Sequence, residues 1–240
     1  MNISKIKKYY NILYYKMNYV VIILGIIIVF LLYYIYIWMN SAKTLQTSAN
    51  LMDSNPPITT LKDPSNLNYS YGIWLYANSW DNSIKKNIIT RSNNFTLYLD
   101  QLTPTLYCDI SLDDTTTQTI TITNNFPLQK WVYIIFSADS QIVDFYLNGK
   151  LVISQKLTTM PKVPSDATAS PLILGGTNVW DARVANLIRV THPMSPEEVM
   201  NNYISGYNSV SGAGIFSMNS YNANLKVLKN GEIFADTKLF

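Results

Sequence analysis

The 240-residue chain contains one cysteine, one histidine and three glutamates. A single thiol excludes an internal disulfide, a cysteine-based zinc site and a CxxC redox pair. Cys108 shares a face with apolar residues in an alternating segment, which indicates a buried, inert thiol. His192, the lone histidine, lies in a predicted surface loop, and neither a P-loop nor a dinucleotide-binding glycine pattern is present. The sequence therefore gives little support to nucleophilic, histidine-based or nucleotide-dependent catalysis.

Charge is also scarce, since only 14% of the residues are Asp, Glu, Lys or Arg, and the net charge is +3. Four of the lysines lie in the first 16 residues, which hold no acid, so the rest of the chain carries −1. The excess of positive charge therefore lies in this N-terminal tail. It gives no support to nucleic-acid binding by a folded domain.

What the chain does have is a long apolar run near its N-terminus. No charged residue occurs from Met17 to Ala42, and residues 19–38 read YVVIILGIIIVFLLYYIYIW. A helix of about 20 residues spans about 30 Å, the thickness of the hydrocarbon core of a bilayer. We therefore predict a single transmembrane helix over residues 17–40. A cleaved signal peptide is the alternative, but its apolar core is usually only ~7–15 residues long.

Lysines set the predicted orientation of this helix. Four precede it and only Lys43 follows closely, so the positive-inside rule places residues 1–16 in the cytoplasm and the remainder across the membrane. The same lysines would also suit an anionic lipid surface, although setting topology is the favoured interpretation. Residues 41–65 are polar and contain prolines, which is typical of a linker, with a short edge strand considered at Ile58–Leu61.

Short strands dominate the sequence from residue 66 to residue 206. Pro127–Gln155 predicts a three-stranded meander at the centre of the domain, with a type I′ turn at Asn148-Gly149 because that turn needs positive φ at both positions. The other predicted strands are Tyr69–Ala77, Asn87–Thr90, Asn94–Asp100, Thr105–Leu112, Thr117–Thr123, Pro171–Leu174 and Val184–Val190. Regular short strands with intervening turns indicate an all-β fold, an antiparallel jelly-roll β-sandwich.

One short helix is predicted near the C-terminal side of the sandwich. Ser195 is placed as its N-cap, Pro196 at its first position, Glu198 as the partner in a capping box, and Gly206 at its end. Its expected buried face comprises Val199 and Tyr203, with Met200 and Ile204 as further candidates. Residues 207–240 form a tail with a candidate hairpin, which would either complete a sheet edge or act as a separate contact element.

Five segments carry a family resemblance. They are Tyr71-Gly-Ile-Trp-Leu-Tyr, Trp131-Val-Tyr-Ile-Ile-Phe-Ser-Ala-Asp, Phe145-Tyr-Leu-Asn-Gly-Lys-Leu-Val, Leu172-Ile-Leu-Gly-Gly and Met194-Ser-Pro-Glu-Glu-Val. In this order they resemble a laminin-G-like domain of the concanavalin A-like lectin/glucanase superfamily. Pro127-Leu-Gln-Lys-Trp-Val further resembles signal-anchored members encoded by nucleocytoplasmic large DNA viruses. That resemblance implies a membrane protein of a virion or an infected cell.

The resemblance raises two questions of chemistry. Glycosidases of the superfamily need two carboxylates across a cleft, and no predicted strand carries an E-x-D-x-E arrangement, so we expect no enzyme. Many relatives hold calcium at the sandwich rim. Asp139 occupies the matching position, but Ser140 replaces the usual glycine and Ala185 stands where relatives often have an acid. We therefore expect no cofactor, with calcium at Asp139 as the alternative.

Sugar binding requires exposed aromatic rings beside amide groups. Trp80 with Asn78, and Trp180 with Asn178, lie in predicted loops of this composition, whereas Trp74 and Trp131 alternate with apolar residues and are predicted to be core. Packing beneath the loops is the alternative for Trp80 and Trp180. Asn68 and Asn94 lie in glycosylation sequons, which are usable only if the domain enters the secretory lumen.

The leading hypothesis is a non-enzymatic single-pass membrane protein that presents its sandwich for structural or adhesive contacts. The expected partners are the lipid bilayer and capsid or membrane proteins, with a virion membrane as the expected location. The alternative hypothesis is a carbohydrate-binding attachment lectin that acts through the loop tryptophans.

Overall fold

The computed structural model describes residues 19–35, 43–176, 178–210, 224–229 and 232–238 of the chain. Its contacts divide the chain into two units, Met1–Ala42 and Lys43–Phe240. The predicted basic tail of residues 1–16 lies outside the described residues.

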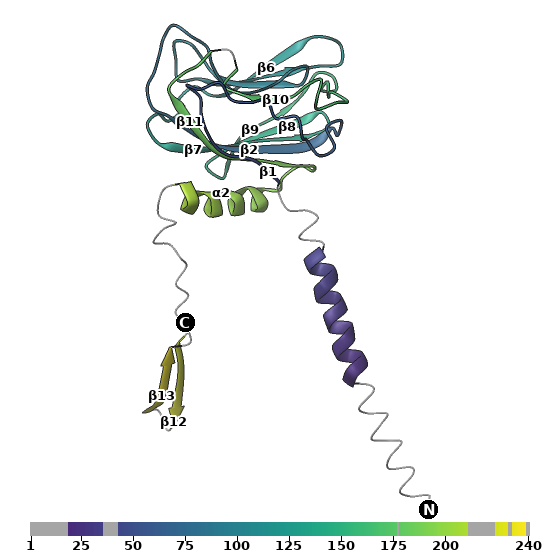
Figure 1. Ribbon diagram of the computed structural model, residues 1–240, viewed down its shortest axis with the longest axis vertical. Coiled ribbons are helices and arrows are strands. Elements are labelled where there is room, and N and C mark those ends of the chain that lie inside the picture. The colour runs from purple at the N-terminus through teal and green to yellow at the C-terminus, as the bar shows by residue number, and fades with distance from the viewer. Residues whose placement is uncertain (1–18, 36–42, 177, 211–223, 230–231, 239–240) are drawn as a thin grey trace, which may run out of the picture. The chain divides into compact units, whose positions relative to one another are not determined.

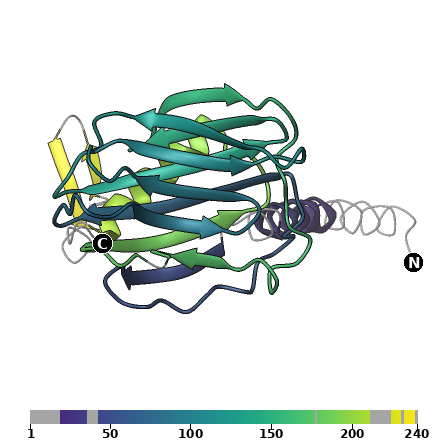
Figure 2. The same ribbon diagram turned by 90° about the horizontal axis from the view of Figure 1, so that it is seen from above.

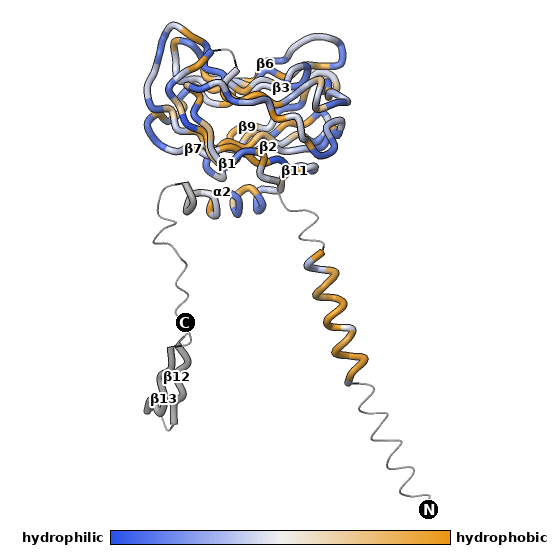
Figure 3. The backbone as a smooth tube through the Cα atoms, in the orientation of Figure 1, coloured by the Kyte–Doolittle hydropathy of each residue, from blue (hydrophilic) through white to orange (hydrophobic). Residues whose placement is uncertain are grey.

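The first unit contains one helix, over residues 19–35, and its apolar character is evident in Figure 3. Within the residues that the structure describes, no helix is both long enough and apolar enough to cross a membrane. Residues 17, 18 and 36–40 of the predicted spanning helix lie outside the described part, so a membrane-spanning helix over residues 17–40 stays a prediction.

The second unit is built on two antiparallel sheets that face each other as layers of a sandwich (Figures 1 and 2). The six-stranded sheet has the order β1 (Lys43–Asn50), β11 (Ala182–Val190), β2 (Asn68–Ala77), β7 (Trp131–Asp139), β8 (Ile142–Leu147) and β9 (Lys150–Lys156). The five-stranded sheet has the order β10 (Leu172–Leu174), β3 (Lys86–Arg91), β4 (Phe95–Leu99), β5 (Leu106–Ser111) and β6 (Thr117–Thr123). The predicted antiparallel β-sandwich is confirmed.

The core lies between the two sheets and follows from period-2 alternation. In β5 the buried residues are Leu106, Cys108 and Ile110, and each alternates with a half-buried neighbour. In β2 even the residues of the outward face are largely buried, which indicates that something covers that face. Burial raises the pKa of the Cys108 thiol well above its usual value, so the thiol is inert as predicted.

The predicted meander is present as β7, β8 and β9, which are neighbours in the sheet. Asn148 and Gly149 have φ values of 50° and 80°, so the predicted turn with two positive φ angles is confirmed. The meander is not at the centre of the sheet, because β9 forms one edge. The longest pairing ladder joins β2 to β7, and this pair forms the middle of the layer.

Strand β1 falls within the predicted linker, which is a correction to residues 41–65. It forms the other edge of the six-stranded sheet by pairing with β11, for example at Ala49↔Val184. Its sequence KTLQTSAN contains a single large apolar residue, so side-chain periodicity gives no sign of a strand. At Ile58 there is only an isolated bridge to Leu172, in place of the strand considered at Ile58–Leu61.

Helix α2 (Pro196–Val210) lies against the outer face of the six-stranded sheet (Figure 1). Its N-cap is confirmed, because the Glu198 amide donates to Ser195 Oγ at 3.2 Å. A capping box would also need the Glu198 carboxylate to accept a hydrogen bond from the Ser195 backbone N–H, and this bond is not formed among the described residues. The carboxylate lies 3.1 Å from His192 Nε2. The His192 side chain is 38% exposed in the loop before α2, so the predicted surface loop is confirmed and the ring is paired with Glu198 there.

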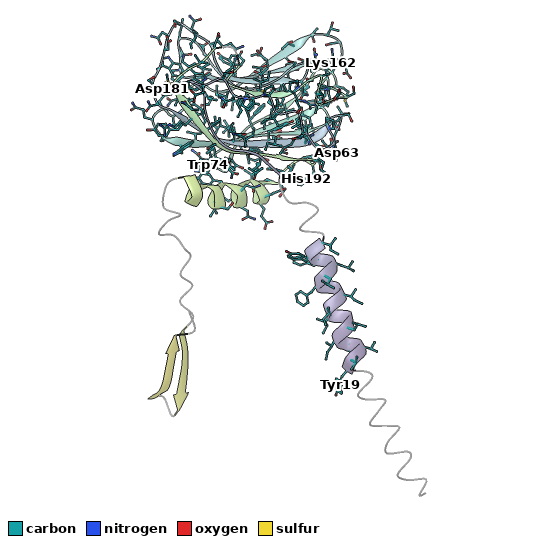
Figure 4. All side chains as sticks on the ribbon, viewed as in Figure 1. Tyr19, Asp63, Trp74, Lys162, Asp181 and His192 are labelled. Atoms are coloured by element: carbon teal, nitrogen blue, oxygen red, sulfur yellow. The ribbon has the colours of Figure 1, made fainter. Side chains whose placement is uncertain are left out.

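An aromatic stack joins α2 to the sheet. The Trp74 ring stacks on Tyr133 at 5.0 Å and on Tyr203 of α2 at 5.6 Å, and Figure 4 shows Trp74 at this helix. A Cβ on Gly206 would lie 2.5 Å from Trp74 Nε1, so Gly206 gives room to the indole within the helix instead of ending it. Trp74 is buried as predicted, but beneath α2 on the outer face and not between the sheets.

The buried face of α2 contains fewer residues than predicted. Val199 is fully buried, whereas Met200 and Ile204 are 37% and 54% exposed.

The candidate C-terminal hairpin is also present, as β12 (Asn224–Lys229) paired with β13 (Glu232–Lys238) in a two-stranded sheet of its own. Residues 230 and 231, between the two strands, lie outside the described residues.

Candidate functional site: a groove on the six-stranded sheet

A groove with a volume of about 790 Å³ opens on the six-stranded sheet. It is lined by Thr47, Ser48, Ala49 and Asn50 of β1, by Trp131 of β7, and by Arg183, Ala185 and Asn186 of β11. The volume falls in the range of small-molecule binding sites. We call this feature the Trp131 groove.

Strand register places the three larger lining residues, Asn50, Arg183 and Trp131, in one cross-strand row with Tyr76. Asn50 pairs with Arg183, Arg183 with Tyr76, and Tyr76 with Trp131. Directly opposed residues on one face have Cβ atoms about 5 Å apart, so the four side chains are consecutive neighbours across four strands. The Tyr76 and Trp131 rings are in contact at 5.5 Å with a tilt of 58°. The row combines two aromatic rings, one guanidinium and one amide.

The next row explains why the surface is hollow. Ser48 pairs with Ala185, and Ala185 with Trp74. Two small side chains therefore stand beside the large ones of the first row. Ala185, which replaces an acid that relatives often carry, leaves space on the sheet where a longer side chain would fill it.

The backbone is irregular where β11 borders the groove. The pairing of β11 with β2 shifts between Ala185 and Ile188, and Asn186 within this interval has a φ of 49°. A non-glycine residue in the left-handed region costs of order 1 kcal/mol and is enriched at functional sites. Bulges re-aim side chains, and this one brings Asn186 to the lining of the groove.

The Trp131 groove was not anticipated from the sequence, and the prediction that Trp131 is core is wrong. Trp131 is only half-buried, because it lies on the outer face at the first position of β7. The predicted strand Val184–Val190 began too late to include Arg183. The available signal was alternation: Trp131 is out of phase with the inward-facing Val132 and Ile134.

Of the predicted loop tryptophans, Trp180 does not fit a sugar-binding role. Its side chain is only 4% exposed, and its indole N–H donates to the Asn87 carbonyl at 2.8 Å. A ring packed into the core has no free face for a pyranose, so the alternative interpretation, packing beneath the loop, applies. This corrects the prediction for Trp180.

Trp80 is half-buried, and its ring covers a buried cation. Lys86 Nζ lies 3.9 Å from the Trp80 ring centroid. The ammonium also donates to three carbonyl oxygens, those of Ile84, Asp100 and Gln101, at 3.1, 3.3 and 3.0 Å. Desolvation lowers the pKa of Lys86. One face of Trp80 is therefore occupied by the protein's own ammonium group.

The predicted amide partners of these tryptophans are exposed. Asn78 Nδ2 donates to Asp181 Oδ2 at 2.6 Å, and the Asn78 amide donates to the Asp181 carbonyl at 3.0 Å. Asn178 is exposed in the loop that precedes β11. The structure thus ties the loop containing Asn78 to that containing Asp181, and sugar binding at Trp80, Asn78 and Asn178 stays a prediction.

Asp139, the predicted calcium ligand, is exposed at the end of β7. Across the described ranges, no three His, Cys, Asp or Glu side chains lie close enough together to hold a metal ion. Ser140 takes the usual glycine position with a φ of 54°, and its amide donates to Asn68 Oδ1 at 3.0 Å. Calcium binding at Asp139 stays a prediction.

The two sequon asparagines differ in their surroundings. Asn68 is half-buried and accepts the Ser140 hydrogen bond. Asn94 is fully buried, and its Nδ2 donates to the Tyr69 hydroxyl and the Lys162 carbonyl at 3.0 and 2.8 Å. A glycan on Asn94 is incompatible with this packing, which corrects the prediction for Asn94 and leaves Asn68 as the remaining candidate.

The sandwich is similar in fold to the binding domains of several solved toxin structures. No curated protein matches the sequence. The botulinum neurotoxin serotype D binding domain superposes with a TM-score of 0.52 at 12% identity, covering 69% of this chain and 47% of the other. The binding domain of Paraclostridial Mosquitocidal Protein 1 gives 0.53 at 12%, covering 70% and 46%.

A third structure is the serotype D ligand-binding domain in complex with N-acetylneuraminic acid. It gives a TM-score of 0.53 at 14% identity and covers 69% of this chain and 46% of the other. The chain thus spans about half the length of these solved structures, and at these identities the likeness shows the fold alone. The sequence profile of the concanavalin A-like lectin/glucanases superfamily matches residues 38–200, more than half of the chain. The protein therefore belongs to the concanavalin A-like lectin/glucanase superfamily, as a laminin-G-like member.

Proposed function

We propose that this protein is a non-enzymatic carbohydrate-binding protein and that the Trp131 groove holds the sugar. The observation that carries the proposal is the cross-strand row of Asn50, Arg183, Tyr76 and Trp131 beside a hollow of about 790 Å³. An indole offers an apolar face to the C–H groups of a pyranose. The neighbouring guanidinium and amides offer hydrogen bonds to its hydroxyl groups.

Three further observations support this proposal over a purely structural role. The chain belongs to a superfamily named for lectins and glucanases, and one structure of the same fold was determined with N-acetylneuraminic acid bound. Strand β1 also lies at the edge of its sheet, so backbone groups on its free side face outward beside the groove. These groups add donors and acceptors to a site already lined by amide and hydroxyl side chains.

The positions of the carboxylates relative to the Trp131 groove favour sugar binding over sugar hydrolysis. A glycosidase places two carboxyl groups about 5–10 Å apart across its cleft. The Trp131 groove has no Asp or Glu in its lining. Glu197 and Glu198 lie in the first turn of α2, where Glu198 is paired with His192. We therefore propose binding without catalysis at this site.

The direct test measures the affinity of the full chain for sugars found on a glycan array. Replacing Trp131 with alanine is expected to weaken binding about 5–30-fold, because loss of an aromatic stacking partner costs of order 1–2 kcal/mol. Titration calorimetry gives the affinities, and circular dichroism with the melting temperature shows that the variant is folded. The matched control is Trp80→Ala, which removes the half-buried loop tryptophan and is expected to leave the affinity unchanged.

Two results would overturn the proposal. An array without any bound glycan would exclude the carbohydrate-binding function for the sugars displayed and favour a structural or adhesive role through protein partners. Binding that is lost in Trp80→Ala and retained in Trp131→Ala would move the site to the loops of Asn78 and Asn178.

Membrane attachment and a virion location stay predictions that rest on sequence alone. Their basis is the uncharged run from Met17 to Ala42 and the lysines before it. If this run anchors the protein, the expressed full chain is expected to stay with the membrane fraction after alkaline carbonate extraction. Release into the supernatant would contradict the predicted single-pass, N-terminus-inside topology.

A further inference from the structure

Arg183 is the only charged side chain that lines the Trp131 groove. It is exposed, and within the described part of the chain no acidic group lies within ion-pair distance of it. Its cross-strand neighbours, Asn50 and Tyr76, are both uncharged. The groove therefore carries one positive charge that no neighbouring carboxylate neutralises.

The buried arginines of the sandwich show what a structural guanidinium looks like in this fold. Arg189, on the same strand as Arg183, is 3% exposed and donates to the Tyr71 hydroxyl and to the carbonyls of Lys62 and Asp63. Arg91 is 1% exposed and donates to three carbonyls. In contrast, the Arg183 guanidinium donates no hydrogen bond to the described residues. Its planar set of N–H donors is therefore available to a ligand.

We propose that the Trp131 groove binds sugars that carry a carboxylate and that Arg183 recognises this group. A guanidinium forms two parallel hydrogen bonds with a carboxylate, and such charge-assisted pairs are about twice as strong as neutral ones. Trp131, two positions away in the same cross-strand row, then faces the ring that bears the carboxylate. The inference rests on the proposed function and narrows it to the class of uronic and sialic acids.

Charge balance supports a ligand with a single negative charge. The lining supplies one cation and no anion, so one carboxylate is neutralised in full. A neutral sugar would leave the guanidinium without an ionic partner, and a dianionic phosphate would remain half-compensated. The hydroxyl and amide groups of Ser48, Asn50 and Asn186 suit the uncharged remainder of such a sugar.

The test compares each acidic sugar with its own methyl ester, which keeps the shape and removes the charge. The probes are methyl glucuronide and the methyl glycoside of N-acetylneuraminic acid, titrated into the full chain by calorimetry. At least one acid is expected to bind about tenfold or more tightly than its ester, since a hydrogen bond to a charged group contributes about 1.5–3 kcal/mol. The advantage of the acid is expected to shrink as salt rises, while ester binding stays constant.

Variants assign this preference to Arg183. Arg183→Gln is expected to reduce the acid to the affinity of its ester, and Arg183→Lys to retain part of the preference, because a lysine keeps the charge and loses the fork. Lys162→Gln is the control: Lys162 is exposed, lies outside the groove and takes part in the described hydrogen bonds only through its backbone. It removes one positive charge and should leave both affinities unchanged.

Failure of this inference is distinguishable from failure of the proposed function. If acid and ester bind equally, or if Arg183→Gln keeps the preference for the acid, then Arg183 does not read a carboxylate. Binding that still depends on Trp131 would in that case preserve the carbohydrate-binding function. If no sugar binds, acidic or neutral, both proposals are wrong.

Discussion

Replacing Lys86 with methionine is expected to lower the free energy of unfolding by about 3 kcal/mol or more. The ammonium group is fully buried and donates to the carbonyls of Ile84, Asp100 and Gln101. A thioether donates no hydrogen bond, so the three part-buried carbonyl oxygens lose a charged donor, and a hydrogen bond to a charged group contributes about 1.5–3 kcal/mol. Methionine avoids the desolvation of a cation, which recovers part of this loss, but it leaves the three acceptors unsatisfied.

The control for this prediction is the adjacent residue. Lys85 Nζ lies 3.3 Å from Asp109 Oδ2, and its side chain is 42% exposed. Because exposed ion pairs contribute about 0–1 kcal/mol, Lys85→Met is expected to change the stability by less than about 1 kcal/mol. Guanidinium unfolding followed by circular dichroism measures both variants. Equal, small effects of the two substitutions would show that the carbonyl cage around Lys86 has no structural role.

The second large effect is expected at alkaline pH. Burial raises the pKa of Tyr69 and Tyr133 well above the usual 10 of tyrosine. Both phenols stay neutral in the folded protein while they ionise in the unfolded chain. The stability they contribute is fully present below pH 10 and is lost as the pH rises from 10 towards the folded pKa. In this pH range each tyrosine lowers the free energy of unfolding by about 1.4 kcal/mol per pH unit.

Lys86 acts in the opposite direction. Its pKa is lowered in the folded state, so the cost of burying its charge is present at neutral pH and is relieved as the pH rises towards the usual lysine value. The free energy lost through the two tyrosines exceeds the free energy gained through Lys86. The expected net result is a steep loss of stability above pH 10. Unfolding titrations with urea at a series of pH values measure the slope.

Tyr133→Phe isolates one of the two phenols. The Tyr133 hydroxyl is buried and has no hydrogen-bond partner among the described residues. Removing it is expected to raise the stability at pH 7 by about 1 kcal/mol and to reduce the alkaline slope by about 1.4 kcal/mol per pH unit. A variant with an unchanged slope would show that Tyr133 ionises at its ordinary pKa in the folded protein.

Much of the sandwich follows from local sequence patterns. Alternation in Thr105–Leu112 identifies the inner face that buries Cys108, and Asn148-Gly149 identifies a turn that needs positive φ at both residues. Ser195 before Pro196 identifies the start of α2. These features are decided by neighbours within a few residues, so the chain reveals them without reference to the rest of the fold. The order of such segments also indicated the superfamily.

The candidate site depends on pairings that no local pattern contains. Trp180 and Trp131 exchange their predicted places: the loop tryptophan is in the core and the strand tryptophan lines a groove. Whether an aromatic side chain is exposed depends on what covers it. Here α2 covers Trp74, while the Trp131 groove is completed by β1, an edge strand held to β11 by backbone hydrogen bonds.

The fold class, the position of most strands and the cap of the helix can thus be predicted from the sequence, because side-chain alternation and turn geometry are local properties. The residues around the Trp131 groove are brought together only by the folded chain. The register of β1, β11, β2 and β7 brings together Asn50, Arg183, Tyr76 and Trp131. Backbone pairing between strands distant along the chain sets that register, and such pairing leaves no trace in side-chain periodicity.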